Sequence, residues 1–174
     1  MPAPNIADIM DWESHYEGAL KNYFQNIQIA NVNVFAQVLT PKTIANISLG
    51  TTPVQTPRLQ IKMSASRSLL EETTGPNNNG AYYLSDKEAV IAIDVCSQRN
   101  ADPTQHHGLL RGLTRQGMLE MSAVLNANTL PYYQTLDVIE TGSTQGIDAE
   151  NEEIITSINY SVRFFIIPTQ FPAN

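Results

Sequence analysis

The amino-acid sequence predicts an α+β fold: a mainly antiparallel sheet with two main helices packed on it, and long loops or hairpin excursions. Two segments repeat apolar residues every three or four positions, and several others alternate apolar and polar residues. Stretches rich in proline and asparagine separate them. With 174 residues and a hydrophobic content of 42%, the chain can bury one core. We therefore expect a single α+β domain over residues 1–174.

The first predicted helix covers residues 5–27, where apolar side chains form one stripe along the helix. The stripe consists of Ile6, Ile9, Trp12, Tyr16, Leu20, Tyr23 and Ile27. Asn5, with Asp8 three positions later, resembles a capping box with a short acid. The pattern indicates a helix with one face against the core.

Three strands are predicted between the two helices. Residues 32–39 and 58–65 read as strands, and residues 40–57, which hold three prolines, read mostly as a loop. Residues 75–80 carry the strongest turn signal of the chain and are expected to tip a long excursion. Residues 87–98 are apolar on both sides at their centre, which predicts a central strand.

The second predicted helix covers residues 102–126. Asp102-Pro103 is a favourable start, because an acid caps the first turn and proline fits the first helical position. Its stripe is expected to hold Leu110, Leu113, Gly117, Met121 and Val124. Gly108, Gly112 and Gly117 each cost about 1 kcal/mol relative to alanine in a helix, so we interpret them as marks of close packing.

The last predicted elements form a long hairpin. Residues 132–140 are one strand, residues 142–151 a polar, acidic connection, and residues 154–167 the closing strand. One side of that strand carries Ile154, Ile158, Tyr160, Val162, Phe164 and Ile166, and the other carries Ile155, Ser157, Asn159, Ser161, Arg163 and Phe165. Pro168 then ends it, because proline has no N–H for the ladder.

The composition narrows the possible functions. A net charge of −7 argues against phosphate binding as a main task. Only 16% of residues are charged, which fits a surface made for subunit contact and, equally well, a merely polar surface. The single cysteine, Cys96, excludes an intramolecular disulfide and is expected to be a small buried hydrophobe. No membrane span or secretory signal is expected, and we predict a cytoplasmic protein in the cell that makes it.

His106 and His107 are the first candidates for chemistry. Adjacent residues on a helix point about 100° apart, so the two rings do not easily hold one metal ion, and we expect a solvated first turn. Residues 142–146, Gly-Ser-Thr-Gln-Gly, faintly resemble a phosphate loop. They lack the Gly-Lys-Ser/Thr ending and are surrounded by acids, so we expect a hairpin loop.

The paired carboxylates Glu71-Glu72 and Asp86/Glu88 are expected to be solvated charges near turns, and Cys96 has no identifiable base. The sequence therefore predicts no catalytic, cofactor-binding or metal-binding residue, no cofactor, and no enzyme activity. Seven basic residues either line one local basic face or only serve solubility: Arg58, Lys62, Arg67, Lys87, Arg99, Arg111 and Arg115.

The order of elements resembles that of the tail terminator and tail-completion (head–tail joining) proteins of tailed bacteriophages. The resemblance is carried in detail by residues 158–168, Ile-Asn-Tyr-Ser-Val-Arg-Phe-Phe-Ile-Ile-Pro, and by the helix-then-strand opening from Ala19-Leu20 to Val38. It implies a virion structural protein of the tail or neck, made in the host cytoplasm, that forms a homohexameric ring. Such a ring caps the tail tube, stops its polymerisation and joins tail to head.

The implied partners are other copies of the chain, the tail tube protein and the neck or head-completion protein. DNA passes through the ring without specific binding, which a negative balance favours. The alternatives are another tail or neck component, namely a tube subunit, connector or baseplate protein, and a small-ligand-binding or enzymatic α+β domain. If the chain forms a ring, we expect charge reversal at Glu150, Glu152 and Glu153 to affect assembly or DNA passage more than folding.

Overall fold

The computed structural model describes residues 12–41, 53–68, 86–99, 106–124 and 133–166. Several predictions lie outside these residues: the helix start at residues 5–11, most of the loop at 40–57, Glu71-Glu72, the turn at 75–80, the Asp102-Pro103 helix opening and the tail from Pro168.

A five-stranded sheet forms the body of the molecule, in the order β3-β4-β5-β7-β6. The strands are β3 (Gln37–Leu39), β4 (Arg58–Ser68), β5 (Asp86–Gln98), β6 (Tyr133–Asp148) and β7 (Glu153–Ile166). All neighbours are antiparallel except β3 and β4, which are parallel. The structure thus has the predicted α+β fold with a mainly antiparallel sheet. The predicted strand at residues 87–98 is β5, and its central position is confirmed.

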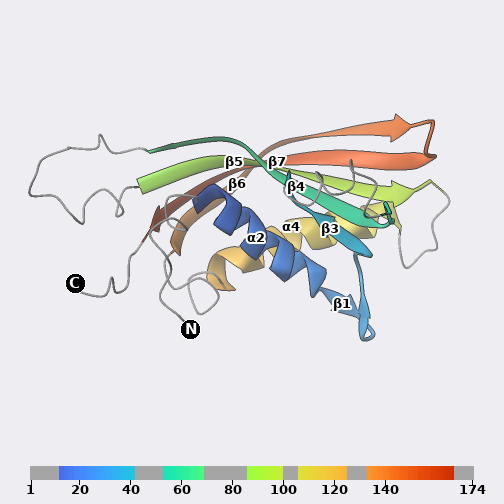
Figure 1. Ribbon diagram of the computed structural model, residues 1–174, viewed down its shortest axis with the longest axis horizontal. Helices are drawn as coiled ribbons and strands as arrows, with labels where there is room; N and C mark the ends of the chain where they lie inside the picture. The colour runs from blue at the N-terminus through green and yellow to red at the C-terminus, as the bar shows by residue number, and fades with distance from the viewer. Residues whose placement is uncertain (1–11, 42–52, 69–85, 100–105, 125–132, 167–174) are drawn as a thin grey trace, which may run out of the picture.

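Two helices, α2 (Trp12–Gln25) and α4 (His107–Val124), lie on the same side of the sheet (Figure 1). Helix α2 packs on β3 and β4, and α4 packs on β5 and β6. Between helices and sheet lies an apolar core in which the Tyr16 and Phe164 rings stack with centroids 4.9 Å apart. The alternation predicted for the last strand is confirmed, since Ile158, Tyr160, Val162 and Phe164 are all buried. Neither described helix covers the opposite side of the sheet, and neither is long and apolar enough to span a membrane.

The two helices approach each other closely at Gly117. A Cβ atom there would lie 2.6 Å from Cε1 of Phe24, a fully buried ring of α2. The expectation of close packing is therefore confirmed at Gly117. It is wrong at Gly112, where nothing lies within 4 Å, and Gly108 meets only the side chain of His106.

The predicted strand at residues 32–39 is wrong as one continuous strand, although both of its ends are in strands and it ends at Leu39 as predicted. Its first part is β2 (Val32–Asn33), which pairs with β1 (Gln28–Ile29) in a small hairpin, and its last part is β3. Ala30 and Asn31 form the turn with φ angles of 51° and 64°, a conformation that asparagine tolerates and that suits a two-residue hairpin turn. Residues 34–36, between these two parts, are not in a strand, and Val34 and Phe35 are both buried in the core.

The predicted connection at residues 142–151 is also wrong. Strand β6 continues to Asp148 and pairs with β7 along its whole length, with a register shift between Glu140 and Gly142. Residues 142–146 are therefore strand and not a hairpin loop. The turn covers only residues 149–152, where Oδ1 of Asp148 accepts hydrogen bonds from the backbone N–H groups of Glu150 (3.0 Å) and Asn151 (3.3 Å). The long hairpin itself is confirmed.

Candidate assembly surface

Strand β6 is the outer strand on one side of the sheet, and among the described residues no strand pairs with its outer edge. The backbone groups along such an edge are free to pair with another chain. No charged residue occurs between Glu140 and Asp148, and the side chains from Ile139 to Ile147 are exposed. Charge is a common device against unwanted edge pairing, so this uncharged stretch is the part of the edge most open to contact.

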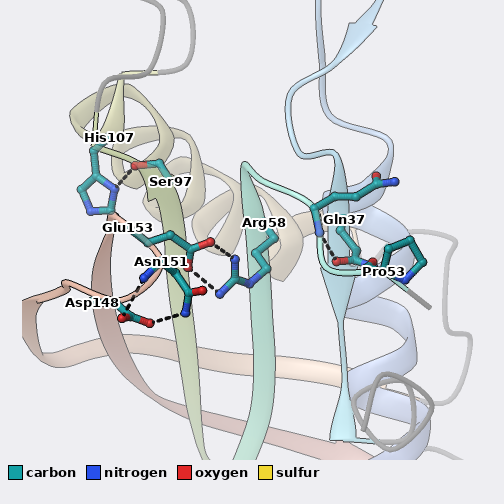
Figure 2. A network of polar contacts seen from close by, with 9 residues as sticks. Gln37, Pro53, Arg58, Ser97, His107, Asp148, Asn151 and Glu153 are labelled. Atoms are coloured by element: carbon teal, nitrogen blue, oxygen red, sulfur yellow. Dashed lines mark hydrogen bonds and ion pairs between the residues drawn. The ribbon is translucent and has the colours of Figure 1, made fainter. Parts of the chain in front are cut away.

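The opposite edge of the sheet is different. Strand β3 has only three residues, and the side-chain amide of its Gln37 is already bonded to the segment before β4 (Figure 2). Nε2 of Gln37 donates to the carbonyl oxygen of Pro53 (3.1 Å), and Oε1 accepts from the backbone N–H of Gln55 (3.1 Å). This edge offers a partner much less backbone than β6 does.

Helix α4 holds β6 in place from the helix-covered side. Arg115 donates two hydrogen bonds of 2.8 Å to the carboxylate of Glu140, and Nη1 of Arg111 donates to Oε1 of Gln145 (3.0 Å). The hydrogen bonds with Arg115 lower the pKa of Glu140, and the same contact raises the pKa of Arg115. The edge is therefore fixed before any partner arrives.

A buried ion pair holds the β6–β7 hairpin at its turn end (Figure 2). Arg58 of β4 reaches across β5 to Glu153 of β7, with Nη1–Oε1 and Nη2–Oε2 distances of 2.5 and 2.7 Å. Burial lowers the pKa of Arg58, but the hydrogen bonds to Glu153 and the nearby negative groups together outweigh it, and the pKa is raised. Nε of Arg58 is buried, and no partner for it occurs in the part of the chain that the structure describes.

Cys96 lies on β5 between the strands that this ion pair joins, as the cross-strand partner of Arg58 on one side and Ile155 on the other. It is a buried free cysteine, as predicted. Burial raises its pKa to about 11, so the thiol stays neutral at physiological pH.

His107 is not in a solvated first turn, contrary to the prediction. Its ring is buried between two buried hydroxyls: Nδ1 lies 2.7 Å from Oγ of Ser97 on β5, and Nε2 lies 2.7 Å from Oγ1 of Thr156 on β7 (Figure 2 shows the first). Burial lowers its pKa, and the nearby charges of Arg111 and His106 add to this. Of these two histidines, only His106 is exposed, as expected.

A serine beside a histidine resembles a nucleophile with its base, but here the serine is fully buried and both ring nitrogens are in use. We interpret the three side chains as a polar link between α4, β5 and β7. Within the described residues, no group of three His, Cys, Asp or Glu side chains is placed to hold a metal ion.

The other candidate residues are dispersed. Arg58 and Lys87 are buried, Lys62 is exposed, and Arg115 is paired with Glu140, so the described basic residues do not form one face. The placement of Glu88 near a turn is also wrong, because Glu88 lies within β5, half-buried, and accepts a hydrogen bond from Oγ of Ser161 (3.1 Å).

No protein-family model matches the chain, and no curated protein does.

Proposed function

We propose that this protein is a structural subunit that assembles head to tail into a ring and acts as a bacteriophage tail terminator. The outer edge of β6 is the observation that carries this proposal. It is long, exposed and free of charge between Glu140 and Asp148, in a chain with a net charge of −7. Copies with the same net charge repel each other, so uncharged surfaces are where two copies approach most easily.

The two edges of the sheet differ in length and exposure, and this difference supports a ring. A contact between β6 and any different surface of the next copy is head to tail, and repeated head-to-tail contacts close into a ring or continue as a filament. A contact between β6 and β6 would instead give a two-fold dimer. The ring is expected to contain about six chains, to sit on the tip of the tail tube and to bind the neck or head-completion protein. Its negative charge lets DNA pass without binding.

Light scattering after size-exclusion chromatography, over a wide range of protein concentrations, tests the proposal. We expect a species of about six chains at high concentration and closed rings in electron micrographs. Long tubes would favour a tube subunit. A two-chain limit, or a stable monomer at the highest soluble concentration, would contradict the ring.

The Thr144→Glu variant ties that result to the edge. Thr144 is exposed and lies in the uncharged stretch of β6. A carboxylate there adds charge to the edge, and we expect the large species to be lost while the fold, measured by circular dichroism, is kept.

A further inference from the structure

The β1–β2 hairpin is built as a rigid projection. Its base is anchored in the core, where Val34 is buried and Ile27 packs against the buried cluster, and the backbone N–H of Val34 donates to the carbonyl of Ile27 (2.9 Å). Further out, Nε2 of Gln28 donates to Oδ1 of Asn33 across the two strands (2.9 Å). In Figure 1 the hairpin extends away from the sheet, past the end of α2.

Two aliphatic side chains lie together at the outer end of this hairpin. Ile29 and Val32 are direct cross-strand partners and are 45% and 68% exposed. Side chains that face each other across a pair of strands lie on the same face, so they form one small apolar tip. In the folded chain much of the apolar surface of these two side chains remains exposed to solvent. Because burying apolar surface is favourable, a partner that covers the tip would gain free energy.

The hairpin and its surroundings also lack charge. No charged residue occurs between Lys21 and Lys42, a stretch that contains the hairpin and β3. The hairpin and the stretch of the β6 edge between Glu140 and Asp148 are therefore both free of charged residues. We call residues 28–33 the apolar hairpin and residues 141–147 the uncharged edge.

These two surfaces lie at opposite edges of the sheet. The apolar hairpin ends only three residues before β3, the outer strand on one side, and the uncharged edge is part of β6, the outer strand on the other. A contact between them within one chain would have to cross the whole sheet. Between copies, however, the same contact can repeat from one chain to the next, because each chain has one of the two surfaces for each of its two neighbours.

We infer that the apolar hairpin of one copy docks on the uncharged edge of the next copy, and that this is the contact that builds the assembly. The inference rests on the proposed ring and names its two surfaces. Docking buries Ile29 and Val32 against the neighbour's β6 and gives the free backbone groups of that strand a partner. Neither surface contains a charged residue, so the contact brings no like charges together.

Three variants with the same added charge test this contact. Val32→Glu changes the tip of the apolar hairpin, Thr144→Glu changes the uncharged edge, and Leu119→Glu changes an equally exposed (65%) apolar residue on α4, outside both surfaces. Each variant is first checked for an unchanged unfolding midpoint. We expect Leu119→Glu to assemble like the wild type, and the other two to run as single chains.

Mixing then distinguishes the type of contact. Val32→Glu keeps an intact edge and Thr144→Glu keeps an intact hairpin, so an equimolar mixture at the concentration where the wild type assembles should form pairs of one copy each and stop there. If the Val32→Glu variant still forms wild-type rings, or if the two variants fail to pair, the hairpin contact is wrong although the ring stands. If the wild type itself never assembles, the proposed function fails.

Discussion

Two arginine–glutamate pairs connect distant parts of this fold, with similar bonds and very different surroundings. Arg58–Glu153 ties β4 to β7 across β5, and its two side chains are 9% and 6% exposed. Arg115–Glu140 ties α4 to β6, and its side chains are 40% and 33% exposed. Both pairs make two hydrogen bonds. In the buried pair the loss of one partner leaves a charge without water, whereas in the exposed pair water replaces the partner.

The same contrast occurs with other residue types. Helix α4 has one glycine against a buried ring (Gly117) and one that faces open space (Gly112), and its N-terminus has one buried histidine (His107) and one exposed (His106). In each pair the same residue type occurs once in a buried and once in an exposed position. Comparing the two positions separates the effect of the residue type from the effect of its burial.

The largest effect is expected from Glu153→Gln. The variant leaves the Arg58 guanidinium buried without its counter-charge, and we expect a loss of about 3–5 kcal/mol in the free energy of unfolding, measured with urea. Glu150→Gln, on the exposed turn three positions earlier, should leave the urea midpoint nearly unchanged.

The double variant Arg58→Met/Glu153→Leu extends this test. Two apolar side chains of similar size remove both charges together, and replacing a buried ion pair in this way is often neutral or stabilising. We expect the double variant to be clearly more stable than Glu153→Gln alone. If both lose the same free energy, the buried charge of Arg58 is not the cause of the loss.

Glu153 also shows what the sequence could and could not predict. Local patterns identified both helices, the central strand and the closing hairpin, because these depend on periodicity within one segment. The sequence groups Glu153 with Glu150 and Glu152 because the three acids are near neighbours, whereas its partner Arg58 lies 95 residues away. Charge reversal at Glu153 is therefore expected to affect folding, in contrast to Glu150.

The candidate surfaces were missed for a related reason. Glycine, serine and threonine at residues 141–146 favour a loop locally, but pairing with β7 continues through them and makes them a strand. The apolar hairpin had a readable signal in Ala30-Asn31 between Ile29 and Val32, because asparagine accepts the positive φ of a tight turn.

A smaller effect is expected from Gly117→Ala. The new methyl group would lie 2.6 Å from the ring of Phe24, and overpacking of this kind costs about 1–3 kcal/mol, which exceeds the gain of about 1 kcal/mol in helix propensity. Gly112→Ala, with nothing within 4 Å, should keep the full gain and raise the thermal midpoint. If both substitutions stabilise the protein, α2 and α4 do not pack as closely as described.

His107 makes the stability of the folded protein depend on pH. The pKa of His107 is lowered from 6.5 in the folded protein, so the unfolded chain binds a proton first as the pH falls. The stability that the neutral ring contributes is complete above about pH 6.5 and is lost as the pH drops through the folded-state pKa. We expect the urea midpoint to fall between pH 7 and pH 5 by less in His107→Gln than in the wild type. An equal slope in His107→Gln and in the wild type would contradict this role of His107.

The smallest effect is expected at the exposed pair. A double-mutant cycle with Arg115→Ala and Glu140→Ala should give a coupling free energy of at most about 1 kcal/mol, because water and salt screen a pair that is about one-third exposed. Raising the salt concentration should reduce this coupling further, while the effect of Glu153→Gln should hardly change, since buried charges are screened much less. A coupling at Arg115–Glu140 that is large and independent of salt would mean that bond geometry, and not burial, decides what an arginine–glutamate pair contributes in this fold.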